Sequence, residues 1–264
     1  MIDETNLESH GSWQKLGAIE PSWNVPGSLP EWKDCVVDRA RSMLERDKNH
    51  AAVLIWSCGN ESYAGEDILA MTQFFHAKDP SRLVHYEGVV HNRAFAAITD
   101  MESRMYTTVN EIREFLSKDR RKPYVCCEYA HAMGNSCGAM KKYMDLAEEE
   151  PLFQGGFIWD YIDQSIYKKD RYGKEFQAYG GDFGERPTDY NFSGNGIAYG
   201  GNRDASPKMQ EVKFCYQNIA VDVQKDKAVV KNKNLFVNTD AFDCVVILEK
   251  EGKKLKEVPM EVSV

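Results

Sequence analysis

The sequence predicts an α/β fold that gives way to antiparallel β structure in its last part. Short apolar runs alternate with amphipathic stretches over most of the 264 residues, and strands that alternate with helices are typical of a parallel sheet. From about residue 217 the pattern becomes near-alternating and rich in valine, which indicates antiparallel strands. We therefore predict an α/β domain over residues 1–215 and the opening strands of a β-sandwich domain over residues 216–264.

Four apolar runs and two amphipathic stretches supply the elements of the first domain. The runs have the length and composition of buried strands, and the amphipathic stretches repeat apolar residues at spacings of three and four. Pro30 stands near the start of the first helical stretch, where a missing backbone N–H costs nothing. The predicted strands lie in 51–61, 82–88, 122–129 and 155–163, and the predicted helices in 30–49 and 138–151.

The composition argues against several functional classes. Lys and Arg number 33 against 41 Asp and Glu, and the resulting net charge of -8 opposes binding to nucleic acid or to an anionic membrane. A neutral small substrate fits this net charge better than nucleic acid does. The seven cysteines lack paired CxxC spacing, which favours reduced thiols. The polar start of the chain is unlike a signal peptide, and no run of 18 apolar residues occurs, so we expect a cytoplasmic protein.

Two glutamates follow separate strands of the predicted parallel sheet. Glu61 comes after the first apolar run and Glu128 after the third. In parallel α/β barrels the loops after the strands build the pocket, so both carboxyls are expected at one rim. Glycoside hydrolysis uses such a pair, one carboxyl protonating the leaving oxygen and the other attacking the anomeric carbon or activating water. The alternative is that each glutamate is an ordinary surface or helix-capping group, and the sequence does not give the separation that distinguishes retention from inversion.

Aromatic side chains gather near the same strand ends. Sugar rings present apolar C–H faces that stack on aromatic planes, so such residues suit a carbohydrate site. Trp159 follows the run GGFI and precedes Asp160, which favours a stacking position about as much as a core position. Trp56 lies inside an apolar run, and core packing is the better interpretation there.

Glu8 and His10 stand two residues apart at the start of the chain. On extended backbone this spacing puts both side chains on one face. Together with Glu61 they would offer two carboxylates and an imidazole to a hard divalent ion such as Mg²⁺. Almost no apolar strand precedes them, so a solvated polar tail is the alternative.

Six stretches of the chain form long and specific motifs: DETNLESHG (3–11), NHAAVLIWSCGNES (49–62), DPSRLVHYEG (79–88), CEYAHAMGNS (127–136), QGGFIWDYIDQS (154–165) and YGGDFGERPTDYNFSGNGI (179–197). In this order they resemble the long-chain bacterial β-galactosidases of glycoside hydrolase family 2. The pairing of GNES with CEYAHAMGNS resembles the galactosidase branch more than the related β-glucuronidases. The resemblance implies carbohydrate metabolism: retaining hydrolysis of terminal, non-reducing β-D-galactose from β-galactosides such as lactose, through a covalent galactosyl-enzyme intermediate.

The resemblance also implies roles for individual residues. Glu61 matches the general acid/base and Glu128 the nucleophile. The Mg²⁺ ligands of the family match Glu8, His10 and Glu61. The residues that match the galactose site are Asn60, Tyr106, His131, Trp159 as a stacking platform, and Asn195, and those that match part of a Na⁺ site are Phe192, through its backbone oxygen, and Asn195.

Family members carry more chain on both sides of the matching stretches. We therefore expect this chain to hold about strands 3 to 8 of a (β/α)8 TIM barrel, followed by the start of a β-sandwich, within a parent protein that forms a homo-oligomer. One alternative is that a complementing N-terminal chain completes the site. A second is a truncated, non-catalytic fragment that is inactive without the missing region. A third is a metal-dependent hydrolase of another class that uses Glu8, His10 and Glu61.

Overall fold

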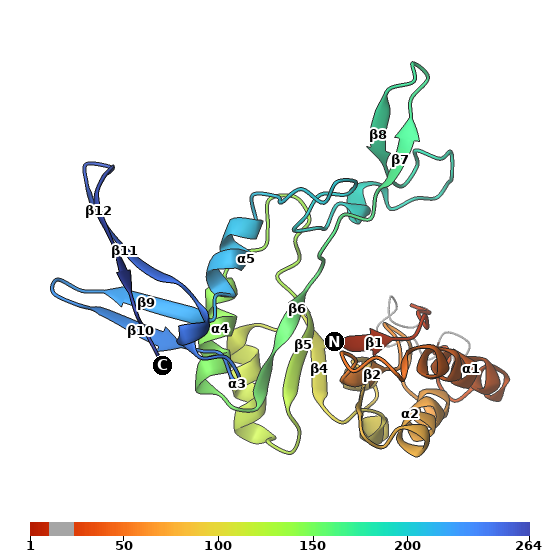
Figure 1. Ribbon diagram of the computed structural model, residues 1–264. Coiled ribbons are helices and arrows are strands. Elements are labelled where there is room, and N and C mark those ends of the chain that lie inside the picture. Colours follow the sequence, from red (N-terminus) through yellow and green to blue (C-terminus); the bar gives the residue numbers. More distant parts are fainter. Residues whose placement is uncertain (11–23) are drawn as a thin grey trace. The chain divides into compact units, whose positions relative to one another are not determined.

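The computed structural model describes residues 1–10 and 24–264, which divide into two compact units (Figure 1). The first unit spans Met1–Met209 and the second Gln210–Val264. The first unit mixes helices and parallel strands, as predicted. Gly11, the last residue of the DETNLESHG stretch, lies outside the described residues. No helix in the described part of the chain is both long and apolar enough to span a membrane.

The first sheet contains three parallel strands, of which the first was not expected. β1 pairs with β2 through Ile2 and Ile55, so the polar start of the chain is a strand because a neighbouring edge supplies its hydrogen bonds. Two helices follow β1 and β2 in the chain and contact each other. The bounds are β1 (Ile2–Glu4), β2 (Ile55–Ser57), β3 (Leu83–His85), α1 (Pro30–Asp47) and α2 (Glu66–Lys78).

Trp56 lies at the centre of the core between this sheet and its helices. Its side chain is fully buried and stacks on the Phe75 ring, with centroids 5.8 Å apart. The indole N–H donates a hydrogen bond of 3.0 Å to Asp79 Oδ2, so its one polar group is satisfied. The core interpretation of Trp56 is therefore confirmed.

A second parallel sheet follows, with helices between its strands. Its strands and helices are β4 (Glu102–Met105), α3 (Val109–Lys118), β5 (Tyr124–Tyr129), α4 (Met140–Glu149) and β6 (Phe153–Ile158). β4 and α3 were absent from the sequence-based assignment. The strand residues ESRM include two charges, and α3 starts at a capping box in which Thr108 and Glu111 bind each other's backbone N–H.

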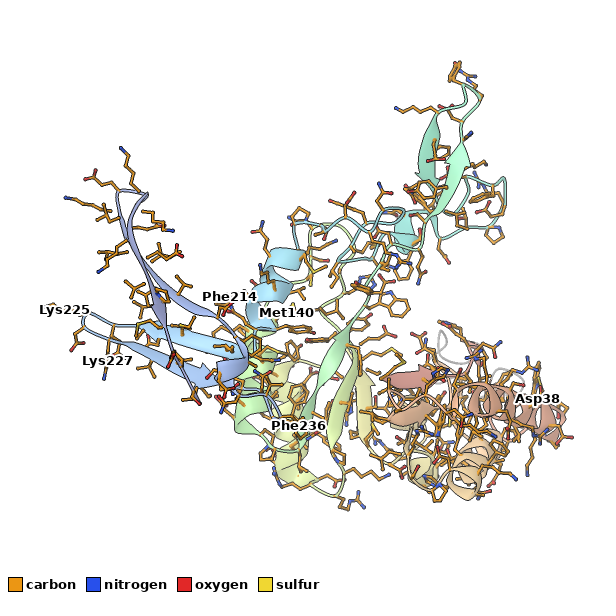
Figure 2. The ribbon with its side chains drawn as sticks, in the orientation of Figure 1. Asp38, Met140, Phe214, Lys225, Lys227 and Phe236 are labelled. Carbon is orange, nitrogen blue, oxygen red and sulfur yellow. The ribbon has the colours of Figure 1, made fainter. Side chains whose placement is uncertain are left out.

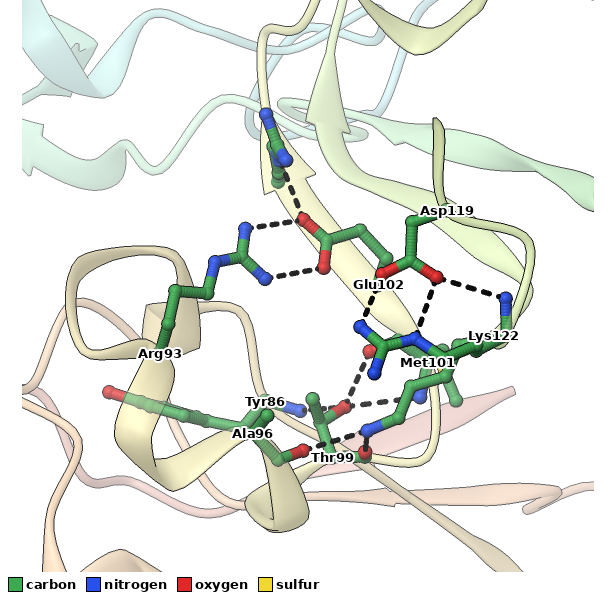
Figure 3. A network of polar contacts seen from close by, with 10 residues as sticks. Tyr86, Arg93, Ala96, Thr99, Met101, Glu102, Asp119 and Lys122 are labelled. Carbon is green, nitrogen blue, oxygen red and sulfur yellow. Dashed lines mark hydrogen bonds and ion pairs between the residues drawn. The ribbon is translucent and has the colours of Figure 1, made fainter. Parts of the chain in front are cut away.

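A polar network explains how a charged strand can be buried (Figure 3). Glu102 is 8% exposed and accepts hydrogen bonds of 2.7 and 2.8 Å from Arg93. Arg104 donates a third, of 2.7 Å, to the same carboxylate. Nearby, Lys122 Nζ donates to the carbonyl oxygen of Ala96 at 2.7 Å. These contacts line a cavity of about 480 Å³, in which Glu102 is compensated by two guanidinium groups.

The parallel strands of the described residues form two separate three-stranded sheets and no closed barrel. Between β3 and β4, side-chain oxygens take hydrogen bonds that a neighbouring strand would otherwise receive. Val84 N–H donates to Asp100 Oδ2 at 2.7 Å, and Tyr86 N–H donates to Thr99 Oγ1 at 3.1 Å. The parallel order agrees with part of a barrel, while the assignment to strands 3 to 8 stays a prediction.

Two 3-10 helices, η2 (Gly88–His91) and η3 (Arg93–Ile98), lie between β3 and β4. After β6 the first unit continues with an antiparallel hairpin, β7 (Ile166–Lys169) with β8 (Glu175–Ala178), and a further 3-10 helix, η4 (Tyr190–Ser193). The chain then returns to the end of β6, because Ile197 N–H donates to the Asp160 carbonyl oxygen at 3.1 Å. This return brings the NFSGNG stretch back to the strand ends.

The second unit contains α5 and two antiparallel hairpins, in agreement with the predicted antiparallel pattern. The two units divide after Met209, whereas the predicted boundary lies after residue 215, and the domain assignment stays a prediction. Large apolar side chains stay exposed in this unit, such as Phe214 at 62% and Phe236 at 95% (Figure 2). A single hairpin buries little apolar surface, and the β-sandwich stays a prediction. The bounds are α5 (Met209–Cys215), β9 (Ile219–Val223), β10 (Ala228–Asn232), β11 (Cys244–Lys250) and β12 (Lys253–Met260).

Candidate active site

The two predicted catalytic glutamates stand at the carboxyl ends of parallel strands. Glu61 lies in the loop after β2, and Glu128 is the penultimate residue of β5. Glu128 is half-buried, and the Glu61 side chain is 20% exposed. Both carboxyls are therefore partly withdrawn from water while remaining open to a ligand.

Burial raises the pKa of both carboxyls. For Glu61 burial has the largest effect, the His10 imidazole opposes it and the charge of Glu8 adds to it. Burial also raises the pKa of Glu128, where a hydrogen bond from Tyr106 acts against it and the charge of Glu61 acts with it. The charge of Glu61 thus disfavours the anionic form of Glu128, as expected for two carboxyls that share a site.

Tyr106 is attached to Glu128 by two hydrogen bonds. Its phenol O–H donates to Glu128 Oε2 at 2.6 Å, and its backbone N–H donates to the Glu128 carbonyl oxygen at 2.7 Å. The Tyr106 ring lies beside the His131 ring, with centroids 5.8 Å apart, and His131 lies 5.7 Å from the ring of Phe192. The structure therefore brings together three residues that are far apart in the sequence.

Glu8, His10 and Glu61, the three predicted Mg²⁺ ligands, converge. His10 Nε2 lies 2.6 Å from Glu8 Oε1, and His10 Nδ1 lies 2.8 Å from Glu61 Oε2. Asn60 Nδ2 donates to the same Glu8 oxygen at 3.2 Å. Carboxylate oxygens are the donors that Mg²⁺ prefers. The imidazole, however, bridges the two carboxylates through different nitrogens, and no group of three His, Cys, Asp or Glu side chains in the described residues is arranged around a single metal position.

Phe192 and Asn195, predicted to share a Na⁺ site, are in direct contact. Asn195 is 1% exposed, and its Nδ2 donates to the Phe192 carbonyl oxygen at 2.5 Å. Asn195 Oδ1 is buried and has no hydrogen-bond partner among the described residues, and the same holds for Asp160 Oδ1. Buried acceptors without donors call for an explanation. A cation coordinated by oxygen atoms would satisfy such acceptors.

Trp159 directly follows β6, and His131 lies in the loop after the neighbouring strand β5. Its backbone N–H donates to the Tyr129 carbonyl oxygen at 3.3 Å, and its own carbonyl oxygen accepts the Ala132 N–H at 2.7 Å. The residue is half-buried. These bonds join the loops after the two strands, so Trp159 and His131 belong to one rim.

Glu87 is the site residue that the sequence analysis missed. It is 2% exposed, and its Oε1 accepts the Glu61 backbone N–H at 2.6 Å. Burial, together with the nearby charges of Glu61, Glu4 and Glu128, raises the pKa of Glu87 to about 8. A signal was present in the sequence: Glu87 stands near the end of the run 82–88, as Glu61 and Glu128 stand at or near the ends of theirs.

Most of the chain matches one protein family. Residues 1–221 match the family model described as glycosyl hydrolases family 2, TIM barrel domain. A β-galactosidase of Halalkalibacterium halodurans is 60% identical over 264 residues, covering 100% of this chain and 26% of that protein. A β-galactosidase of Clostridium acetobutylicum is also 60% identical, with 100% and 29% covered. The chain thus spans less than a third of the length of these two relatives.

Two further comparisons concern a subunit and the fold. A protein named β-galactosidase large subunit, from Latilactobacillus sakei, is 53% identical over 218 residues, covering 82% of this chain and 35% of that protein. A solved glycosyl hydrolase family 2 member from Bacteroides cellulosilyticus gives a TM-score of 0.52 at 16% identity, over 87% of this chain and 31% of that chain. At this identity the structural likeness concerns the fold alone.

Proposed function

This chain belongs to glycosyl hydrolase family 2, and from this premise we propose that it carries the catalytic glutamates of a β-galactosidase. The reaction is retaining hydrolysis of terminal, non-reducing β-D-galactose from β-galactosides such as lactose. The observation that carries the proposal is the position of the two carboxyls at the carboxyl ends of parallel strands, Glu61 in the loop after β2 and Glu128 near the end of β5. The names of the relatives with 60% identity supply the galactoside specificity.

The two carboxyls take different roles. Glu61 is the general acid/base: its proton goes to the glycosidic oxygen as Glu128 attacks the anomeric carbon. Burial raises the pKa of Glu61, which keeps the acid protonated at a higher pH. The Tyr106 O–H stabilises the anionic form of Glu128 before attack. After the aglycone leaves, Glu61 takes a proton from the water that hydrolyses the galactosyl-enzyme intermediate. Retention predicts a carboxyl separation of roughly 5 to 5.5 Å.

The remaining predicted residues bind the sugar and two cations. Trp159 offers a stacking face, and Asn60, Tyr106, His131 and Asn195 offer groups to galactose hydroxyls. Mg²⁺ would be held by Glu8, His10 and Glu61 and would supply positive charge next to the acid/base, provided that the His10 ring leaves its bridging position. Na⁺ would be held by the Phe192 carbonyl oxygen and the buried Asn195 Oδ1.

The activity of residues 1–264 by themselves is a separate question. The described strands leave two open parallel sheets, and a misplacement of about 1 Å in a site can cost on the order of 100-fold in rate. We therefore propose that the 264 residues alone have little activity and that further polypeptide completes the pocket, in a longer parent or as a complementing N-terminal chain. The parent protein is proposed to be a cytoplasmic homo-oligomer.

The test uses the protein at its full natural length and a nitrophenyl β-galactoside. Glu128→Gln should abolish turnover, whereas Glu149→Gln, on the exposed end of α4, should leave it unchanged. A 2-deoxy-2-fluoro galactoside should label the peptide that contains Glu128, because the fluorine slows breakdown of the covalent intermediate. NMR of the first-formed galactose should show the β-anomer.

Three outcomes would contradict parts of the proposal. Full activity of Glu128→Gln would remove the nucleophile assignment. An α-anomer as first product would exclude retention. Turnover by the purified, monodisperse 264-residue chain at roughly 10 per second, an ordinary enzymatic rate, would show that the open sheets suffice.

A further inference from the structure

Glu61 has an unusual backbone conformation directly after β2. Its φ is +42°, in the left-handed region that residues with a side chain rarely adopt. Nearby, Gly59 has φ +134°, and a Cβ there would lie 2.5 Å from the Leu7 carbonyl oxygen. The loop is thus tightly constrained on the side of β1, and a residue held in such a conformation needs fixed partners.

The partners of this loop come from the end of β3. Glu87 Oε1 accepts the Glu61 N–H at 2.6 Å. Tyr86 Oη accepts the Ser62 N–H at 3.0 Å, and the Tyr86 hydroxyl donates to the Ser62 carbonyl oxygen. Two adjacent side chains therefore bind three backbone polar groups of the consecutive loop residues Glu61 and Ser62. We call Tyr86 and Glu87 the β3 clamp.

The β3 clamp is itself rigidly held. Tyr86 is fully buried and Glu87 is 2% exposed. Gly88 lies against the Tyr86 ring, since a Cβ at that position would come within 2.6 Å of Tyr86 Cε1. The Tyr86 backbone N–H donates to Thr99 Oγ1 at 3.1 Å. Because burial, the contact with Gly88 and the hydrogen bond to Thr99 fix Tyr86, the β3 clamp can hold the loop in one position.

We propose that Glu87 and Tyr86 are positioning residues that hold the carboxyl of Glu61 where it can protonate the leaving group. This inference rests on the proposed function, because it assigns Glu61 as the acid/base. Neither clamp residue needs to touch the sugar. Glu87 acts as a hydrogen-bond acceptor for a backbone amide, so an amide side chain of the same length, with its Oε1, can replace it.

A misplaced acid/base leaves a specific kinetic signature. A sugar alkoxide is a poor leaving group and needs a proton, whereas dinitrophenolate leaves without one. Loss of the clamp should therefore reduce kcat/KM for lactose far more than kcat/KM for 2,4-dinitrophenyl β-galactoside. A merely structural role would reduce the amount of active enzyme and lower both values by the same factor.

The experiment measures both kcat/KM values in the full-length protein with Mg²⁺ present. Glu87→Ala should lower the value for lactose by on the order of 100-fold, as expected for a misplacement of about 1 Å, and largely spare the activated substrate. Glu87→Gln should stay close to wild type. Tyr86→Phe, which removes only the hydroxyl, should give a smaller loss with the same selectivity. Glu45→Ala, an exposed carboxylate on α1, serves as the control.

The possible negative results contradict different parts of the argument. If wild type cleaves neither galactoside, the proposed function fails. If wild type is active and Glu87→Ala lowers both substrates equally, or neither, the positioning role is overturned. A Glu87→Gln variant as poor as Glu87→Ala on lactose also overturns it, because the acceptor role would then be insufficient. If Glu87→Ala does not fold, Tyr86→Phe decides: an equal loss on both substrates, or no loss, refutes the clamp.

Discussion

The Tyr106 hydroxyl donates a hydrogen bond of 2.6 Å to Glu128 Oε2, while its backbone N–H holds the Glu128 carbonyl oxygen at 2.7 Å. Twenty-two residues separate the two in the sequence. Tyr106 directly follows β4, and Glu128 lies in β5. These strands are neighbours in one sheet, and their pairing shifts register just before Met105. Tyr106 itself has φ +52°. The hydrogen bond therefore depends on strand pairing and on a local irregularity at the strand end.

Tyr106→Phe should raise the pKa of Glu128. Burial already raises this pKa, and the Tyr106 hydroxyl opposes the rise, so its removal leaves burial uncompensated. Because the nucleophile must be ionised, the acid limb of kcat/KM should move to higher pH. A hydrogen bond to a charged group contributes roughly 1.5–3 kcal/mol, which corresponds to a loss of about 10- to 100-fold in rate. Tyr172→Phe, at an exposed hairpin, should change neither; an unmoved acid limb in Tyr106→Phe would refute this coupling.

Mg²⁺ should stabilise the full-length protein through Glu8 and His10. A ligand that binds only the folded state raises its stability with concentration, so the melting temperature should rise with added Mg²⁺ and fall with a chelator. Glu8→Gln should abolish this dependence, while Glu149→Gln should retain it. Activity should follow the same pattern. A wild-type melting temperature and activity that ignore the chelator would remove the metal from the proposal.

Acid should destabilise the fold through His85. This imidazole is fully buried between Ser57 Oγ at 2.9 Å and Ser103 Oγ at 2.7 Å, and burial lowers its pKa to about 4. The unfolded chain takes up the proton near its ordinary pKa, so the stability contribution is complete above that pH and is lost as pH falls towards 4. The full loss is on the order of 3 kcal/mol.

The measurement is the free energy of unfolding in urea between pH 7 and pH 4.5. In His85→Gln, which carries no titrating ring, the curve should be lower at pH 7 and should fall less steeply with acid than wild type. His50→Gln, at an exposed position, should keep the wild-type slope. Identical slopes in wild type and His85→Gln would mean that another group controls the acid limb.

Glu102→Gln should destabilise the second sheet. Burial alone would raise the pKa of Glu102, but the hydrogen bonds from Arg93 and Arg104 outweigh it and hold the pKa below its ordinary value. Its contribution is therefore present at neutral pH and lost as pH falls through the lowered pKa. Removing the charge should cost about 1–3 kcal/mol. The exposed pair of Arg113 with Glu149 offers the control, since Glu149→Gln should cost less than about 1 kcal/mol; equal costs would contradict the role of burial.

The sequence by itself identified the residues that matter most to the proposed chemistry. Glu61 and Glu128 were found because residues that follow apolar strands of a parallel sheet meet at one edge. Glu8 and His10 were paired by their two-residue spacing, and their motif resemblance pointed to the same set. The helices Pro30–Asp47 and Met140–Glu149 followed from three-to-four spacing of apolar residues. Each of these inferences uses information that lies within a few consecutive residues.

Only the tertiary structure decided the contacts between distant segments. β4 carries charges that no hydrophobic pattern accommodates, and Arg93 satisfies Glu102 only after the chain folds back. The interruption between β3 and β4 depends on where Asp100 and Thr99 come to lie. Glu87 gains its role from one backbone N–H, 26 residues away in the sequence. Local pattern specifies which face of a strand or helix is apolar; the partner of a buried polar group is set by three-dimensional packing, which has no fixed spacing in the chain.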